Sequence, residues 1–343
     1  MGRLEEAEEL LTRCVTIMEA NLGSEDVQVA LRLRALSKYI RNAGRPGDAE
    51  GLLRRSLAIM DANLGPDSME VASTVFGLGV CNREAGRLQE AEELTRQCLA
   101  IEEAHLGSES VEVGYTLHFL GSCLVEAERF GEAEAVLRRS LSIKETKLGP
   151  EDVKVAITLH EMGVCLRELG RLKEAEDAFR TCISITEAKL GREDVEVAKS
   201  LHSLSLCVEK AGRLEEAESL VRRGLGILEK KLGRDHVRVG AALHHVGSFV
   251  RKAGRLEEAE ELFRRCLSIR EGELGLVHVD VADTLYELGA CLREAGRVRT
   301  GEGILKRCMA IQQSASSLKY YNVPMACTQR ELDLCLLDVH PTE

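Results

Sequence analysis

The sequence predicts an all-α protein, an α-solenoid in which antiparallel helix pairs stack in series. The main observation is a repeat of 42 residues. Gly-Arg recurs at positions 2, 44, 86, 170, 212, 254 and 296, and Leu-Gly recurs at 22, 64, 106, 148, 190, 232 and 274. The second observation is composition, because aromatic residues make up only 3% of the chain and Trp is absent. Such a composition favours helices over β-rich folds.

Each unit is expected to form two helices. Between residues 68 and 107, apolar residues recur at helical spacing in two runs, one around Val75 and Leu78 and one around Leu94 and Cys98. Gly86 ends the first helix because glycine readily adopts a left-handed cap, and Gly107 ends the second. Neither helix is apolar enough on all sides to stand alone. Stacking the pairs buries the apolar stripes of neighbours against one another.

The second helix of each unit carries Glu and Arg four residues apart, and such a pair adds roughly 0.2–0.5 kcal/mol to an exposed helix. The pairs are Glu50–Arg54, Glu92–Arg96, Glu134–Arg138, Glu176–Arg180, Glu218–Arg222 and Glu260–Arg264. We expect the Ala before each Glu to be the small residue at a close helix crossing. We expect the carboxylates of this helix to lie in water.

The repeat boundaries divide the chain into three parts. Residues 1–24 read as an orphan second helix, 25–315 as seven tandem 42-residue helix pairs, and 316–343 as a degenerate C-terminal helix and tail. The stretch 327–339 matches the first-helix pattern of 284–295 after a two-residue shift. A solenoid normally closes with polar capping helices. The missing first helix at the start predicts either a fragment of a longer protein or an uncapped end that self-associates.

The repeat resembles the tetratricopeptide repeat. A small residue follows an apolar one inside the first helix, as in Leu78-Gly79, Leu120-Gly121 and Leu288-Gly289. The Ala of the Glu-Ala-Glu motif follows, and then a small residue such as Cys98 or Ser140. The 42-residue length and linkers such as 232–240 are similar to the long repeats of kinesin light chains. This resemblance covers residues 2–315 and implies a solenoid whose first helices line a concave groove.

The sequence departs from kinesin light chains at three points. Val27, Val153, Val195 and Val237 stand where that family usually has Pro in the linker. His160-Glu161, His202-Ser203 and His244-His245 stand where it often has Asn-Asn. The heptad coiled coil that precedes the repeats in that family is absent from this sequence. The resemblance therefore implies the fold, but neither kinesin attachment nor an Asn-based grip on a peptide backbone.

Two rows of first-helix residues are implied to face the groove. The first row is Arg34, Phe76, His118, His160, His202, His244 and Tyr286. The second, seven residues further along, is Arg41, Arg83, Val125, Arg167, Glu209, Arg251 and Arg293. Arg can form forked contacts with carboxylates, and His and aromatic rings offer flat apolar faces. We therefore expect a groove that binds acidic or aromatic peptide segments, with the peptide-binding residues being the members of these rows other than Val125 and Glu209.

A second interpretation of the His row remains open, in which duplication copied His passively and the rings only pack between neighbouring first helices. Metal binding is not expected, because zinc ligands lie about 2 Å from the ion while stacked helices lie roughly 8–10 Å apart. The twelve cysteines contain no Cys-x-x-Cys, and ten of them share two repeat positions. We expect them to be small core residues. The alternative is redox sensing by pairs such as Cys165 and Cys182.

The remaining features narrow the function class. A net charge of −11 argues against a general nucleic-acid surface, and no apolar run reaches the ~20 residues needed to cross a bilayer. No signal peptide precedes the repeats, so we expect a cytoplasmic protein. No phosphate loop, nucleophile elbow or zinc helix occurs, so neither an enzyme nor a cofactor is expected. We predict a scaffold or adaptor that binds other proteins. The alternative is a regulatory array from a larger signalling NTPase or motor-associated protein.

Overall fold

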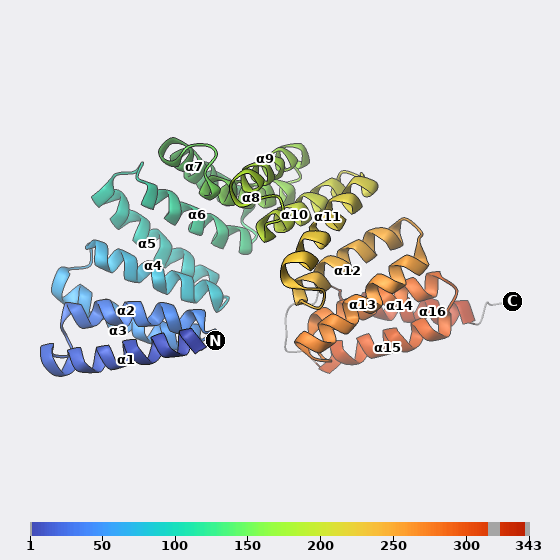
Figure 1. Cartoon of the computed structure of the whole chain (residues 1–343), viewed down its shortest axis with the longest axis horizontal. Helices are drawn as coiled ribbons and strands as arrows, with labels where there is room; N and C mark the ends of the chain where they lie inside the picture. Colours follow the sequence, from blue (N-terminus) through green and yellow to red (C-terminus); the bar gives the residue numbers. More distant parts are fainter. Residues whose placement is uncertain (1, 315–322, 340–343) are drawn as a thin grey trace. The chain divides into compact units, whose positions relative to one another are not determined.

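The described part of the chain is helical throughout, as the sequence predicts. The computed structural model describes residues 2–314 and 323–339, with side chains from 6 to 314 and from 323 to 337. These residues form sixteen α-helices and no strand (Figure 1). Residues 316–322 and 340–343 of the expected C-terminal segment lie outside them.

Seven first helices alternate with seven second helices, between a single helix at each end. The first helices are α2 (Val27–Asn42), α4 (Met69–Glu84), α6 (Val111–Glu126), α8 (Val153–Glu168), α10 (Val195–Lys210), α12 (Val237–Lys252) and α14 (Val279–Glu294). The second helices are α3 (Pro46–Leu64), α5 (Leu88–Leu106), α7 (Phe130–Leu148), α9 (Leu172–Leu190), α11 (Leu214–Leu232), α13 (Leu256–Leu274) and α15 (Val298–Ser314). The end helices are α1 (Gly2–Leu22) and α16 (Met325–Val339).

The chain divides into two compact units, residues 1–178 and 179–343, and the boundary falls inside α9. In the first unit each helix from α1 to α8 packs against the next, and α2 also contacts α4 while α6 contacts α8. In the second unit the same holds from α10 to α16, with further contacts between α12 and α14 and between α14 and α16. In both units, first helices therefore lie beside other first helices.

Helix ends follow the 42-residue period. All seven glycines that follow α1 and the second helices α3 to α13 have φ between +81° and +97°, as at Gly107, and six of the turns after first helices carry Gly with positive φ, as at Gly86. The turn after α6 holds Glu128 instead, at a φ of 57°. Each first helix begins at a capping side chain that accepts a backbone N–H, for example Asp26 from Gln28 and Ser68 from Val71. These caps specify where each pair begins.

The core lies between the two helices of each pair and between neighbouring pairs. The Ala of the repeated motif is fully buried, as expected, at Ala49, Ala91, Ala133, Ala175, Ala217 and Ala259. The cysteines of the two repeated columns are buried as well, except Cys14, and every thiol is free. Burial raises the pKa of Cys165 to about 11. The buried thiols are thus small core side chains, and burial raises the pKa of eight of them, whereas a reactive thiol has a lowered pKa.

The carboxylates of the Ala-Glu motif do not lie in water, and this part of the sequence prediction is wrong. The side chains of Glu50, Glu92, Glu134, Glu218 and Glu260 are only 10–14% exposed. Each pairs with the Arg four residues later, and also with the Arg 37 residues later that follows the glycine turn of the next repeat. Glu134, for example, accepts hydrogen bonds from both Arg138 and Arg171, the latter at 2.6 Å.

These contacts form an inter-repeat clamp, defined here as the bond between the Arg after each first-helix turn and the motif Glu of the preceding repeat. It occurs at Arg45–Glu8, Arg87–Glu50, Arg129–Glu92, Arg171–Glu134, Arg255–Glu218 and Arg297–Glu260. Burial alone raises the pKa of Glu134, but the hydrogen bonds from Arg171 and Arg138 outweigh it and the pKa is lowered. The carboxylate is therefore held in its charged form between two second helices.

The two end helices differ in the face they leave uncovered. On α1, the side chains of Leu10 and Ile17 are each 58% exposed. Ile59 and Ile311, which occupy the repeat position of Ile17 in other second helices, are only 2% and 5% exposed. On α16, the glycine position of the small-residue step holds Asp333, whose carboxylate accepts a hydrogen bond from Gln329 at 2.9 Å. Leu336 and Leu337 of α16 are nevertheless 54% and 58% exposed, so its uncovered surface is mixed rather than polar throughout. Self-association through α1 stays a prediction.

Replacing Glu128 by Gly should stabilise the fold. A residue with a side chain costs roughly 1 kcal/mol at a left-handed position that glycine occupies freely. Because Glu128 is exposed and no contact depends on it, we expect Glu128→Gly to raise the free energy of unfolding by about 0.5–1 kcal/mol. Urea denaturation followed by circular dichroism measures this. An unchanged or lower stability would show that the turn is not strained.

Removing a clamp carboxylate should cost more than removing its exposed neighbour. Arg171 binds both Glu134, which is 14% exposed, and Glu174, which is 55% exposed. We expect Glu134→Ala to lower the free energy of unfolding by about 2 kcal/mol, since a buried charged hydrogen-bond network is lost. Glu174→Ala serves as the matched control and should change it by less than about 0.5 kcal/mol. Equal effects in urea denaturation would contradict the clamp.

Candidate functional site

The first-helix face is defined as the surface formed by those residues of the first helices that do not enter the core. The sequence analysis predicts that both candidate rows lie on this face. In the first row, Arg34, Phe76, His118, His202, His244 and Tyr286 are half-buried. His160 differs, because it is only 6% exposed. Its imidazole is part of the packing between helices and offers almost no surface to a partner. The row is thus not a uniform ladder of accessible rings.

The arginines of the second row already have carboxylate partners within the chain. Arg41 pairs with Glu84 at 2.8 Å, and Arg83 pairs with Glu126 at 3.2 Å. In each pair the Glu lies 43 residues later, on the next first helix. Arg167 pairs with its neighbour Glu168 at 2.8 Å. These side chains are therefore committed to contacts within the first unit.

The second unit repeats this arrangement. Arg251 bridges Glu287 and Glu294, at 3.0 and 2.6 Å, and Arg293 pairs with Glu331 at 2.9 Å. A partner's carboxylate would have to displace these glutamates, so the row as a whole is a poor source of free positive charge.

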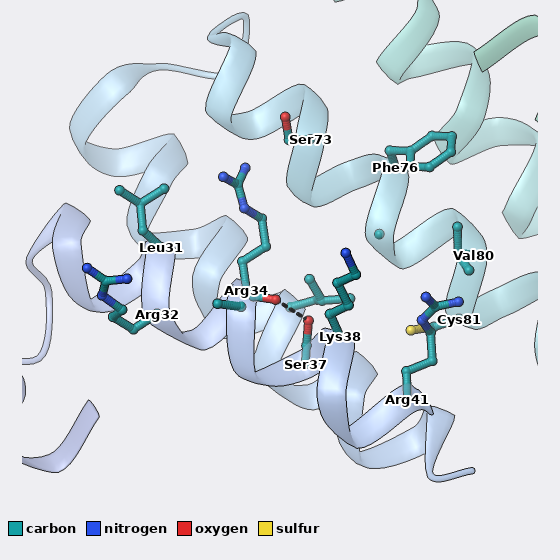
Figure 2. A pocket seen from close by; sticks show the side chains of 13 residues that line it. Leu31, Arg32, Arg34, Ser37, Lys38, Arg41, Ser73, Phe76, Val80 and Cys81 are labelled. Carbon is teal, nitrogen blue, oxygen red and sulfur yellow. Dashed lines mark hydrogen bonds between the residues drawn. The ribbon is translucent and has the colours of Figure 1, made fainter. Parts of the chain in front are cut away.

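A pocket of about 540 Å³ lies between α2 and α4, in the first unit. Figure 2 shows Arg34, Lys38 and Arg41 reaching from α2, while Phe76 and Val80 stand on α4. Its size falls in the usual range of ligand pockets. The pocket therefore combines apolar surface with four cations of one helix, Arg32, Arg34, Lys38 and Arg41.

Three of these cations, Arg32, Arg34 and Lys38, form no ion pair with a carboxylate among the described residues. Arg34 donates through Nη1 to the backbone oxygen of Glu70 at 3.2 Å, and Lys38 is exposed without an ion pair. Burial lowers the pKa of Arg34, partly offset by the charge of Glu70. Lys38 was not predicted as a site residue. Its signal in the sequence is that the same position in the other six pairs is uncharged, as at Val80 and Ser122.

Beside the pocket, α4 and α6 meet through aromatic rings, of which Phe119 is only 9% exposed. The rings of Phe76 and Phe119 lie 5.0 Å apart at 60°, and the guanidinium of Arg83 lies 4.9 Å from the centre of the Phe119 ring. Such tilted pairs and cation–π contacts are typical of rigid recognition surfaces. Phe119 was also missed by the sequence prediction, because it stands one position after the His118 column.

The histidines of the second unit form a buried group. The rings of His202 and His245 lie 4.2 Å apart, and those of His244 and His245 lie 5.6 Å apart. Burial, with the charge of Arg270, lowers the pKa of His244 to about 3. The pKa of His245 is lowered for the same first reason and by the neighbouring His202. At neutral pH the imidazoles of His244 and His245 are uncharged. No group of three or more metal-binding side chains occurs among the described residues.

Comparison with known proteins identifies the repeat. The tetratricopeptide repeat profile matches residues 39–104, 70–146, 154–230 and 238–314. The chain belongs to the tetratricopeptide repeat family. No curated protein matches the sequence. No helix in the described part of the chain is long and apolar enough to span a membrane.

Solved structures show the same fold. A putative kinesin light chain with nearly identical repeats from Podosopora anserina is 24% identical, with a TM-score of 0.52 over 58% of this chain and 94% of that one. BtubC from P. vanneervenii is 18% identical, with a TM-score of 0.56 over 71% and 94%. The apo form of RapI is 14% identical, with a TM-score of 0.65 over 84% and 99%. The predicted likeness to kinesin-light-chain-type repeats is confirmed.

The buried His244 should make the protein sensitive to acid. Its folded-state pKa of about 3 lies below the unfolded value near 6.5, so the unfolded chain binds a proton that the folded chain excludes. Stability is therefore lost as pH falls below about 6.5, at up to about 1.4 kcal/mol per pH unit for this one group. We expect His244→Phe, which copies Phe76 of the same column, to lose less stability than the wild type between pH 7 and 5. Urea denaturation at each pH measures this, and parallel losses would contradict it.

Proposed function

We propose that the chain is a protein–protein interaction scaffold whose first-helix face binds extended segments of other proteins. The family and the fold support this proposal, since stacked helix pairs present a long continuous surface for a bound chain. The pocket between α2 and α4 is the observation that carries it further. Its lining offers aromatic and aliphatic contacts together with cations that the chain leaves uncompensated.

The preferred segment is acidic with an interspersed apolar or aromatic residue. Lys38 and Arg34 attract carboxylates because neither forms an ion pair with a described glutamate, in a protein with a net charge of −11. Phe76 and Val80 bind the apolar residue beside them. The proposed binding site therefore consists of the pocket between α2 and α4 and the adjoining ring of Phe119. It does not include the whole of the Arg and His rows. The arginines with internal partners act as framework for the surface.

The proposal assigns no catalytic step to the chain. The acidic groups that recur in every repeat are engaged in the inter-repeat clamps, as at Glu92 and Glu260, or in the pairs on the first-helix face, as at Glu84. Their recurrence in each repeat is better explained by structure than by a single reaction centre. Binding and alignment of partners is the activity that this surface supports.

Reversing the charge of Lys38 should weaken binding of an acidic segment. The probe is a fluorescein-labelled peptide of alternating Asp and Phe, and its affinity is measured by fluorescence anisotropy at low salt. We expect Lys38→Glu to raise the Kd at least tenfold, because a carboxylate then replaces the free cation of the pocket.

The control is Lys147→Glu, which makes the same charge change at an exposed position of α7 away from the pocket. It should change the Kd by less than twofold. A peptide of alternating Lys and Phe should bind weakly to the wild type. If both variants weaken binding equally, the attraction is a general effect of charge and the pocket is not the site.

A further inference from the structure

The pocket between α2 and α4 has an internal counterpart in the second unit, between α12 and α14. Arg41 of α2 and Arg251 of α12 occupy the same position of the 42-residue repeat. Each of them bonds the Glu that lies 43 residues later on the next first helix, Glu84 at 2.8 Å and Glu294 at 2.6 Å. The two surfaces therefore share one framework, and their differences show what kind of group the pocket accepts.

The second unit contains a carboxylate that the first unit lacks. Glu287 of α14 bonds Arg251 at 3.0 Å, and its side chain is only 15% exposed. The corresponding residue of α4 is Gly77, which lines the pocket. The place beside Arg41 that corresponds to the Glu287 carboxylate is therefore open to an anion from outside the chain.

The first unit also has cations where the second unit has uncharged side chains. Arg34 and Lys38 stand at the positions of His244 and Ser248 in α12. His244 is uncharged at neutral pH, because burial lowers its pKa to about 3. Burial also lowers the pKa of Arg34, which means that its charged form is only partly compensated within the chain. An anion placed beside this guanidinium is therefore favoured.

The charge balance of the two surfaces is opposite. In the second unit, Arg251 binds two carboxylates, those of Glu287 and Glu294. In the first unit, the four cations of the pocket have one ion-paired carboxylate among the described residues, that of Glu84. A second carboxylate, that of Glu70, acts through its charge without an ion pair. Four cations against two carboxylates leave a positive surplus that suits a doubly charged anion.

Three of the cations converge from one face of α2. Arg34, Lys38 and Arg41 are spaced by four and then three residues, so their Cβ atoms lie roughly 5–6 Å apart along that face. Figure 2 shows the three side chains reaching toward α4. A phosphate monoester carries a charge of about −1.5 to −2 at neutral pH and has three acceptor oxygens, so it can bond several of these donors at once. A carboxylate offers one charge and two oxygens. The phosphate is the better match.

The remaining lining of the pocket is apolar. Phe76 and Val80 stand on α4 beside Gly77, and Leu31 and Leu53 complete this part of the lining. The volume of about 540 Å³ leaves room for a ring next to a phosphate. An aromatic ring packs well against Phe76, since aromatic pairs gain stability beyond the area that they bury. The pocket therefore suits a phosphate that is attached to an aromatic ring.

We propose that the pocket between α2 and α4 binds a phosphotyrosine residue of the partner segment, with the phosphate at Arg34, Lys38 and Arg41 and the ring against Phe76. Of the residues whose hydroxyl group is phosphorylated, tyrosine alone provides a ring. This inference rests on the proposed function, because it assigns the acidic and the aromatic preference of that site to one residue of the partner.

The test uses three fluorescein-labelled heptapeptides of Gly and Ser whose central residue is Tyr, phosphotyrosine or phosphoserine. Their affinities for the whole chain are measured by fluorescence anisotropy. We expect the Kd of the phosphotyrosine peptide to be at least tenfold below that of the Tyr peptide and at least fivefold below that of the phosphoserine peptide. Equal binding of either comparison peptide would overturn the proposal, because it would remove the role of the phosphate or of the ring.

Free phenyl phosphate and inorganic phosphate distinguish a peptide from a small ligand. Each competes with the labelled phosphotyrosine peptide in the same assay. We expect both to bind at least threefold more weakly than the peptide, since the backbone of a bound segment adds contacts along the first-helix face. If phenyl phosphate or inorganic phosphate binds as tightly as the peptide, the ligand is not a partner segment and the proposal is wrong.

Two variants of one residue locate the site. Gly77→Glu copies Glu287 and returns an internal carboxylate to the pocket. Gly77→Gln is the matched control, because it adds the same bulk without the charge. In both, the new Cβ lies 3.2 Å from the end of the flexible Leu53 side chain, which must shift by a few tenths of an ångström. Circular dichroism checks that both variants stay helical.

We expect the Kd of the phosphotyrosine peptide for Gly77→Glu to be at least tenfold above its Kd for Gly77→Gln, because the new carboxylate competes with the phosphate for Arg41. Equal Kd values for the two variants would contradict the proposal. Lys38→Glu should likewise raise the Kd at least tenfold, whereas the control Lys147→Glu should change it by less than twofold.

The peptide of alternating Asp and Phe separates failure of this inference from failure of the proposed function. If it binds while the phosphotyrosine peptide binds no better than the Tyr peptide, the scaffold function stands and phosphotyrosine recognition is refuted. If neither peptide binds, both proposals fail. Binding of both peptides, with the phosphotyrosine peptide weakened by Gly77→Glu, supports both.

Discussion

The close contact between the two helices of a pair is the constraint from which the rest of the structure follows. A Cβ on Gly121 would lie 2.5 Å from the side chain of Leu137, and one on Gly247 would lie 2.7 Å from the ring of Phe263. At these two steps the first helix accepts no side chain without displacing its partner, whereas α2 and α10 fit the small buried Ser37 and Ser205 at the same position. This contact fixes the rotation of each first helix about its axis. It thereby decides which of its residues enter the core and which form the first-helix face.

Periodicity was sufficient to predict the helices, their ends and the buried columns, because each depends on residues within one repeat. Ala91 and Cys98, for example, belong to buried columns that contact the helices of their own pair and of the next pair. The burial of Glu92 and Glu134 could not be found this way. Helical spacing within one helix places them on its outer face, and their partners Arg129 and Arg171 come from the next repeat. The division into two units inside α9 left no mark on the period.

The candidate site was predicted less well, for the same physical reason. The second row was chosen because Arg binds carboxylates, yet the glutamates one repeat further, such as Glu84 and Glu126, already satisfy that chemistry. His160 was chosen for its column, although its environment buries it. A better sequence signal for a pocket residue was a residue that differs in kind from those at the same position of the other repeats. Lys38 and Gly224 each stand alone among residues of another kind, and each lines a pocket.

The inter-repeat clamp has a consequence for how such a chain can change in length. At six of the seams between successive repeats the same Arg meets the same Glu, at the same separation along the chain. Excising or inserting one whole 42-residue block therefore recreates an equivalent seam on either side. Copy number is a variable that the backbone tolerates, whereas loss of a single block would erase a pocket outright. Binding properties in such an array can be gained or lost block by block, without redesign of the scaffold that carries them.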